Sequence, residues 1–252
     1  NVYTKTIMAL ISRDLYMRNP FQIARKLKRK ASKAKAKGKA LFSNKIFCIS
    51  LQRTGTTSVG RFFQKHGYEV ATYKTQSRNG WTHLWFNGEV ERIFDSTDFK
   101  TNQVFEDDPW WCGDLYKQLY HRFPAAEFVL FERDADDWFD SMMRHSGGKT
   151  LGNTYLHCCL YNRMEEFYAE YGGTHMVFNR NIDNLMDLEG ERDHYTDFYE
   201  ARNKAVVDFF RYNGSSRLVH LRLEDKMKWQ KLGDHFGIDV APDFRVHANA
   251  SQ

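Results

Sequence analysis

The sequence lacks long apolar runs and has few cysteines. The longest apolar run near its start covers residues 7–11, far short of the roughly 18 residues that a membrane span needs, so neither a span nor a signal peptide is predicted. The four cysteines form no CxxC pair and no zinc-ligand spacing, which excludes the common zinc modules and favours a reducing compartment. Cys48 lies within an apolar strand pattern and is expected to be a buried thiol.

Acidic residues are almost missing from the N-terminal part. Residues 1–45 carry a net charge of +12, whereas residues 46–252 carry a net charge of −7. Nine Lys and Arg fall within 25–39. We therefore predict a basic arm, 1–44, ahead of a folded domain, 45–252. The arm is either a solvated helix or tail, or a polybasic segment that binds anionic lipid at roughly 1 kcal/mol per base. No nucleic-acid partner is expected, because the acidic body offers no second basic face.

The expected location follows from these two observations. Without a predicted span, and with a segment at 25–39 suited to anionic lipid, we expect a cytoplasmic protein that contacts membranes at their surface. The sequence begins with Asn1 rather than Met. If an upstream anchor was removed there, the Golgi lumen is the alternative location.

The composition and periodicity indicate one folded α/β domain. Hydrophobic residues make up 42% of the chain and aromatic residues 15%, which excludes a disordered or fibrous protein. Short apolar runs alternate with helical patterns. The predicted strands cover 45–51, 103–105, 127–132 and 217–223, and the predicted helices 57–66, 112–122, 134–143 and 226–236. This alternation is typical of three layers, with a parallel sheet covered by helices on both faces. The stretch 146–212 lacks strong strands and is predicted to be a helical cap, with helices at 153–171 and 194–211.

A short polar loop joins the first predicted strand to its helix. It reads Leu-Gln-Arg-Thr-Gly-Thr-Thr-Ser over 51–58. A strand, a tight glycine turn and a helix N-terminus form an anion site, because backbone N–H groups and the helix dipole converge there. Arg53 adds a fixed positive charge, and we expect further donors from Thr54, Gly55, Thr56, Thr57 and Ser58. The loop is not a Walker A motif, since it has one glycine and no lysine. The alternative is a helix that is merely capped by Thr56 or Thr57.

This loop resembles that of the sulfotransferases that use 3′-phosphoadenosine-5′-phosphosulfate (PAPS). In that family a strand ends in a (K/R)-(S/T)-G-T-(T/S) loop that cradles the 5′-phosphosulfate, and 53–58 matches this pattern in the form used by bacterial and carbohydrate-type members. The resemblance covers roughly 45–251. It implies a P-loop-NTPase-like sulfotransferase fold and transfer of a sulfonate group to a hydroxyl acceptor. It also implies that PAPS is the donor and that no metal is required.

A second pair of residues strengthens the resemblance. The family binds the donor's 3′-phosphate with an Arg at a strand end and a Ser eight residues later, and Arg133 and Ser141 have this spacing. The C-terminal end of the predicted strand places Arg133 at the crevice where ligands bind in open α/β sheets, and its guanidinium is suited to phosphate. The alternative is that Arg133 pairs with Asp136 or Asp137 on its own helix.

Three consecutive acids follow the short strand at 103–105. In the family a base stands two residues before a proline, and Asp107 has that place ahead of Pro109. Its role would be to accept the proton of the acceptor hydroxyl. Repulsion from Glu106 and Asp108, with burial by nearby tryptophans, would raise its pKa. If the strand continues regularly, Asp107 faces away from the other two acids. We therefore rank Asp107 first as the base, with Glu106 and Asp108 behind, and Asp108 could instead cap a helix.

The remaining signals concern the tail, the acceptor and the metals. The tail 244–249 resembles the family's ending, and Arg245 is a candidate contact to the 3′-phosphate, although the Arg-Lys-Gly loop of the cytosolic enzymes is absent. Six Trp and thirteen Tyr suggest a groove that stacks on sugar, formed by Trp81, Trp85, Trp110 and Trp111, while core packing is favoured for Trp138 and Trp229. We expect a glycan, glycolipid or small alcohol as acceptor. No metal site is expected, because His157, Cys158 and Cys159 cannot share one ligand face.

Two other classes of protein stay open. A P-loop nucleotide or small-molecule kinase would need a loop lysine and Mg²⁺, and the lysine is missing. A non-catalytic membrane-binding module would need only residues 1–45 for its function. Neither class explains why the loop at 53–58 occurs together with the spacing of Arg133 and Ser141.

Overall fold

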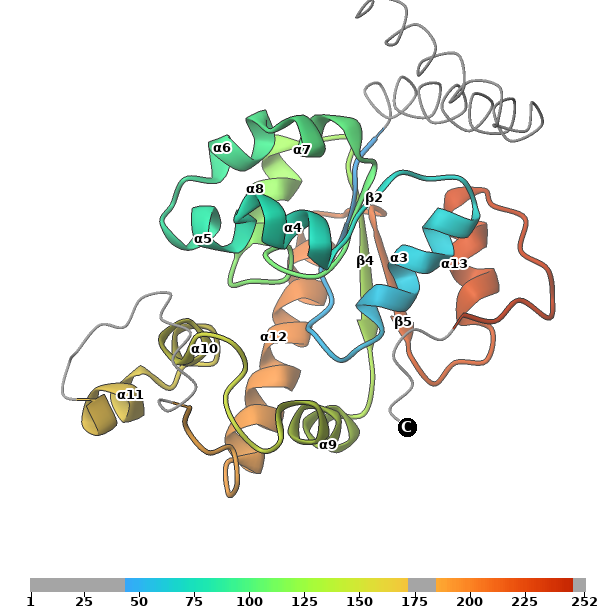
Figure 1. Ribbon diagram of the computed structural model, residues 1–252. Coiled ribbons are helices and arrows are strands. Elements are labelled where there is room, and N and C mark those ends of the chain that lie inside the picture. Colours follow the sequence, from blue (N-terminus) through green and yellow to red (C-terminus); the bar gives the residue numbers. More distant parts are fainter. Residues whose placement is uncertain (1–43, 172–184, 247–252) are drawn as a thin grey trace, which may run out of the picture.

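The computed structural model describes residues 44–171 and 185–246 (Figure 1). The predicted arm, with its basic segment 25–39, and the His and Asn of the predicted tail motif lie outside these residues. Within them, no helix combines the length and apolarity that crossing a membrane requires.

A five-stranded parallel sheet forms the centre of the domain. Its strand order is β2-β3-β1-β4-β5. The strands are β1 (Ile46–Cys48), β2 (Val70–Ala71), β3 (Val104–Phe105), β4 (Glu127–Glu132) and β5 (Leu218–Arg222). Every pairing is parallel, and Phe47 of β1 lies opposite Phe105 on one side and Phe128 on the other. The predicted α/β fold with a parallel sheet is therefore confirmed.

Two helices cover one face of this sheet (Figure 1). They are α3 (Thr56–Lys65) and α13 (Lys228–Phe236). Phe62 of α3 stacks on Trp229 of α13 with ring centroids 5.5 Å apart, and both pack against Val129 of β4 in one buried cluster. Truncating such a buried aromatic to alanine costs about 3–5 kcal/mol, so this layer holds the start of α3 firmly at the end of β1.

The opposite face carries a larger helical layer (Figure 1). Phe47 and Ile49 point to it while Ile46 and Cys48 point to the α3 side, as the period of two in a strand requires. The layer includes α8 (Leu115–Arg122) and the second half of α12 (Arg192–Tyr212). Four short helices complete it: α4 (Tyr73–Asn79), α5 (Trp81–Phe86), α6 (Val90–Asp95) and α7 (Thr97–Thr101). The sequence analysis did not predict these four, nor strand β2.

The predicted cap is helical, with two differences from the prediction. Its helices are α10 (Thr154–Leu160) and α11 (Met164–Tyr171), which follow α9 (Ala135–Ser146). The predicted single helix at 153–171 is broken, because Asn162 has a left-handed φ of 58° that a continuing helix cannot contain. In α12, Tyr195 and Tyr199 pack with α9 residues, but Val206 and Phe210 pack on the sheet. The range 146–212 therefore includes residues that belong to the sheet's own helical layer.

Candidate active site

The loop at 51–58 turns tightly from β1 into α3. Gly55 is the N-cap of α3 with φ 87°, and it accepts hydrogen bonds from the amides of Ser58 (2.9 Å) and Val59 (3.0 Å) through its carbonyl. This left-handed φ favours glycine, and a Cβ at Gly55 would also stand 2.9 Å from Leu223 Cδ1, so the leucine side chain would have to shift. No side chain caps α3. The alternative of a helix capped by Thr56 or Thr57 is therefore wrong, and the helix N-terminus keeps its character as an anion site.

The loop hydroxyls differ in what they can offer a ligand. Thr54 is fully buried and its hydroxyl donates to the Leu51 carbonyl, so it stabilises the loop instead of contacting an anion. Thr56 and Ser58 are also largely buried, whereas Thr57 is half-buried. The Thr54 hydroxyl is therefore already engaged within the loop, and Thr57 carries the most accessible hydroxyl of the loop.

The structure brings two separately predicted motifs into contact. Arg53 Nε donates to Ser141 Oγ over 3.2 Å, although the two residues lie 88 positions apart. Ser141 is buried on α9, a helix whose start is fixed by Asp134, which accepts from the amide of Asp137 at 3.1 Å. The residues assigned from the resemblance to the 5′ and 3′ ends of one donor thus belong to one continuous site.

Positive charge gathers around this contact. Burial lowers the pKa of Arg53, and the charges of Arg133 and Arg144 lower it further. Burial, followed by the charge of Arg53, lowers the pKa of His145. Arg144 and His145 lie three and four residues after Ser141, on the same side of α9. Their spacing of three and four residues from Ser141 could have indicated that they lie near Arg53, and the sequence analysis did not use it.

Arg133 is poorly paired within the chain. Its Nε is buried without a hydrogen-bond partner among the described residues, and its only ion pair there is a 3.8 Å contact to the exposed Asp137. Asp136 binds Arg192 instead, at 2.9 Å. The Arg133 amide donates to the Tyr199 hydroxyl at 2.9 Å, which fixes its backbone at the end of β4. A buried donor without a partner costs about 1–3 kcal/mol, and a bound anion would recover that cost.

The three acids lie beside α3, close to the loop. Glu106 is buried and packs against Gly60, where a Cβ would stand 2.9 Å from Glu106 Cγ. Burial, with repulsion from Asp108, raises the pKa of Glu106 to about 7. Burial, followed by repulsion from Asp108 and Glu106, raises the pKa of Asp107 to about 8. Carboxyl groups with such raised pKa values are suited to proton transfer near neutral pH.

The regular alternation predicted for the acids is wrong. β3 ends at Phe105, and Asp107 has a left-handed φ of 74°, so strand geometry does not continue through the acids. Asp108 is not a helix cap, because its carboxylate accepts from Gln76 Nε2 at 3.0 Å and Thr82 Oγ1 at 2.5 Å. Asp107 Oδ1 accepts the Asp108 amide at 2.9 Å, and its side chain is half-buried. Asp108 is also half-buried but is held by two side-chain donors, whereas Glu106 is buried, with its Oε2 unpaired among the described residues. Asp107 is thus more accessible than Glu106 and less tightly held than Asp108.

The aromatic groove predicted for sugar stacking is largely wrong. Trp81 and Trp110 are fully buried in the core under α4–α8, and Trp111 is buried with α9 and α12 residues. Only Trp85 is half-buried. Trp138 and Trp229 are core residues, as predicted. Trp138 also has a second role, since its Nε1 donates to the Gln52 carbonyl at 2.9 Å and anchors the loop to α9.

Three other candidates take different places. Arg245 is exposed, and its guanidinium donates to the carbonyls of Pro242 and Phe244, which lie in its own segment and not in the loop at 51–58. All four cysteines are free thiols, and Cys48 is buried as predicted. Across residues 44–171 and 185–246, no group of three or more His, Cys, Asp or Glu is placed to hold a metal ion.

Comparisons with known proteins give one family match. A family model described as "Sulfotransferase domain" matches residues 45–251. A search of curated proteins finds no match. Among solved structures, a sulfotransferase from Alicyclobacillus acidocaldarius is similar over 83% of this chain and 86% of its own, with 14% sequence identity and a TM-score of 0.40. That identity and TM-score are too low to transfer residue roles from one chain to the other.

Proposed function

The chain belongs to the sulfotransferase domain family, and from this premise we propose that it transfers a sulfonate group from PAPS to a hydroxyl acceptor. We propose a carbohydrate or glycolipid as the acceptor, with a small alcohol as the simplest substitute. The observation that carries the proposal is the contact between Arg53 Nε and Ser141 Oγ at 3.2 Å, because it unites the two phosphate motifs in one site. The under-paired Arg133 supports it, since a 3′-phosphate offers the partner that Arg133 Nε lacks.

The donor side of the site is suited to a highly charged anion. The amides at the start of α3, with Arg53, would bind the 5′-phosphosulfate and stabilise charge that develops on its bridging oxygen. Arg133 and Ser141 would bind the 3′-phosphate. Arg144 and His145 add positive charge beside Arg53 and are proposed as further contacts to the donor.

The acid cluster would supply the base. In its ionised form, Asp107 would accept the proton of the acceptor hydroxyl as the hydroxyl oxygen attacks sulfur. Its raised pKa of about 8 makes it a stronger base than an ordinary carboxylate. The same shift reduces its ionised fraction at neutral pH, so we expect turnover to rise with pH until about 8. Glu106, buried against Gly60, would act mainly by raising the pKa of Asp107.

A thermal-shift experiment tests the donor assignment. Ligands that bind the native state raise its stability, by about 2.7 kcal/mol at a concentration of 100 Kd. For a chain of this size that is a rise in Tm of roughly 5–10 °C. We expect 3′-phosphoadenosine 5′-phosphate to produce such a rise, and ATP with Mg²⁺ to produce less. A larger rise with ATP and Mg²⁺ would instead favour a kinase. Labelled PAPS incubated with a panel of glycans, glycolipids and small alcohols would then identify the acceptor class.

The basic segment suggests where the reaction takes place. We propose that 25–39 holds the protein on an anionic membrane surface near a lipid-linked acceptor, since the body of the chain is acidic and would be repelled. Co-sedimentation with anionic vesicles should be lost in a chain that starts at Asn44 and should weaken as salt is added. Equal sedimentation of the two chains would rule out this role.

A further inference from the structure

One tyrosine of the helical insertion forms a hydrogen bond with the donor loop. Tyr161, which ends α10, is 1% exposed, and its hydroxyl accepts from Gln52 Nε2 at 2.9 Å. The Gln52 carbonyl in turn accepts from Trp138 Nε1 at 2.9 Å. Gln52 is therefore held from two sides, by α9 through its main chain and by α10 through its side chain.

The residue after Gln52 needs this support. Arg53 has φ 66°, a left-handed conformation that costs a non-glycine residue roughly 1–2 kcal/mol. Such strain persists only where the surrounding structure over-determines the backbone. Gln52 is fixed before Arg53, and the buried hydroxyl of Thr54 is fixed after it by the Leu51 carbonyl. This conformation brings Arg53 Nε to Ser141.

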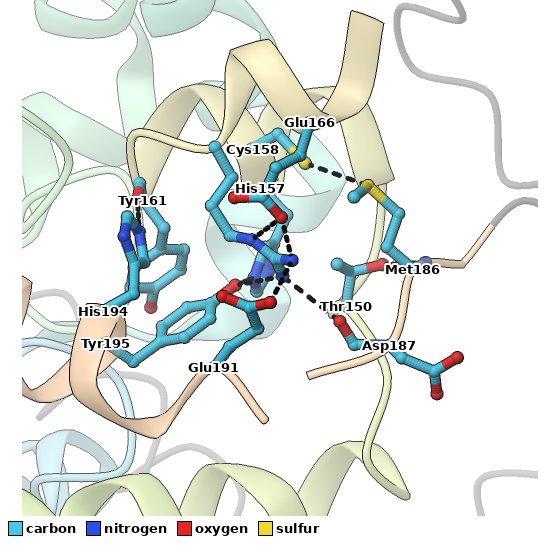
Figure 2. Close-up of polar contacts among 11 residues, drawn as sticks. Thr150, His157, Cys158, Tyr161, Glu166, Met186, Asp187, Glu191, His194 and Tyr195 are labelled. Atoms are coloured by element: carbon cyan, nitrogen blue, oxygen red, sulfur yellow. Dashed lines mark hydrogen bonds and ion pairs between the residues drawn. The ribbon is translucent and has the colours of Figure 1, made fainter. Parts of the chain in front are cut away.

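Tyr161 is itself held by a dense polar network, which Figure 2 shows. His194 Nε2 donates to the Tyr161 carbonyl at 2.6 Å, and the ring of His157 lies 4.6 Å from that of Tyr161. The Leu151 amide donates to His157 Nδ1 at 3.2 Å, so Nε2 carries the proton and donates to the Tyr195 hydroxyl at 2.7 Å.

A buried arginine completes the network. Arg163 is 3% exposed and donates to Glu166, to the Asp187 carbonyl and to the Tyr195 hydroxyl. Because every one of these donors has a partner, the described residues around Tyr161 hold its hydroxyl at a fixed place.

We propose that Tyr161 is a positioning residue for the donor loop: its hydroxyl holds Gln52 and thereby keeps Arg53 in the conformation that faces the donor. The insertion and the donor loop are then coupled through this hydrogen bond. The proposal rests on the proposed function for the identity of the ligand, but not for the loop geometry.

The test compares two buried tyrosines of the same network. Tyr161→Phe keeps the ring and removes the hydroxyl that meets the loop. Tyr195→Phe is the matched control, because its hydroxyl bonds to His157 and Arg163 but not to the loop. By calorimetry with 3′-phosphoadenosine 5′-phosphate, we expect Tyr161→Phe to raise Kd about tenfold, the size of one lost hydrogen bond. The KM for PAPS should rise in parallel while the KM for the acceptor stays unchanged. Tyr195→Phe should lower Tm and leave Kd within about twofold.

A ligand-free measurement separates this proposal from the function. Amide hydrogen exchange of 52–56 should be faster in Tyr161→Phe than in the wild type, and unchanged in Tyr195→Phe. In a Gln52→Ala background, Tyr161→Phe should have no further effect on Kd. Wild-type affinity and exchange in Tyr161→Phe, or an equal loss in Tyr195→Phe, would overturn the positioning role. If the wild type does not bind the bisphosphate, the proposed donor fails while the exchange experiment still decides the role of Tyr161.

Discussion

Two arginines, one just before α9 and one just after α10, differ in how many of their buried donors have a hydrogen-bond partner. Arg163, in the insertion, is buried among Glu166, Glu191, Tyr195 and the Asp187 carbonyl. Arg133, at the end of β4, has a buried Nε without a partner and a single 3.8 Å contact to an exposed aspartate. Burying an unpaired donor costs free energy that burying a paired one largely avoids. Of these two arginines, Arg163 is thus paired within the structure, whereas Arg133 keeps an unpaired donor at the carboxyl end of β4, where we propose that the donor binds.

The acid cluster extends this comparison to negative charge, and it gives the largest expected effect. Asp107→Asn should lower turnover about 10²–10⁴-fold, because asparagine keeps the shape but accepts no proton. Affinity for 3′-phosphoadenosine 5′-phosphate, measured by calorimetry, should stay unchanged. Glu106→Gln is the matched control and should cost far less. Near-normal turnover in Asp107→Asn together with an inactive Glu106→Gln would move the base by one residue.

The paired arginine should matter for stability. Arg163→Met should lower the free energy of unfolding by about 2–3 kcal/mol, since it breaks a buried network but leaves carboxylates that water still reaches in part. Arg133→Met is the control, and it should leave stability unchanged or raise it by up to about 1–3 kcal/mol, because it removes a buried donor that has no partner. Urea denaturation measures both. Equal losses of unfolding free energy in the two variants would show that Arg133 contributes to stability as much as Arg163 does.

The open arginine should matter for the ligand. Arg133→Ala, Arg53→Ala and Ser141→Ala should each weaken binding of the bisphosphate, by about 1.5–3 kcal/mol for the arginines and less for the serine. Calorimetry at fixed salt measures the change. Unchanged affinity in all three variants would refute the donor site.

The last expected effect is a dependence of stability on pH. In the folded state the pKa of Asp107 is raised to about 8 and that of Glu106 to about 7, both above their ordinary values near 4. The native state therefore holds protons that the unfolded state has lost, so the free energy of unfolding should fall as pH rises from about 4 to 8 and level off above. Thermal melts across this range should show a shallower fall for Asp107→Asn. Identical profiles for the wild type and Asp107→Asn would mean that the pKa of Asp107 is not raised in the folded state.

The sequence predicts the parts of this molecule that depend on strong local patterns. The run 127–132 is buried on both faces of the sheet, and its continuous apolar character therefore indicates a central strand. The loop at 53–58 is equally clear, because a glycine turn between strand and helix has few other uses. Arg133 and Ser141 are predicted from the resemblance to the sulfotransferase family, whose spacing they match, and the structure brings Ser141 to Arg53.

Other parts depend on tertiary contacts that no local pattern contains. β2 has two residues and is a strand only because β3 lies beside it. Trp81 and Trp110 are equally compatible with a sugar groove and a core, and packing alone decides for the core. The left-handed backbone of Asp107 is rare outside glycine, so strand alternation could not predict its direction. Tyr161 reaches Gln52 across 109 positions, a pairing that only the folded insertion creates.

The strand order has a consequence for how the chain is made. β5 pairs with β4 along its whole length, although Leu218 and its partner Phe128 are ninety positions apart in the sequence. During synthesis β4 emerges long before β5. The N–H and C=O groups on the outer edge of β4 therefore stay unpaired until the insertion, α12 and β5 have been made. An unpaired apolar edge of this kind is a template for aggregation. A truncation that removes β5 would therefore leave the outer edge of β4 unpaired, and we expect such a chain to aggregate.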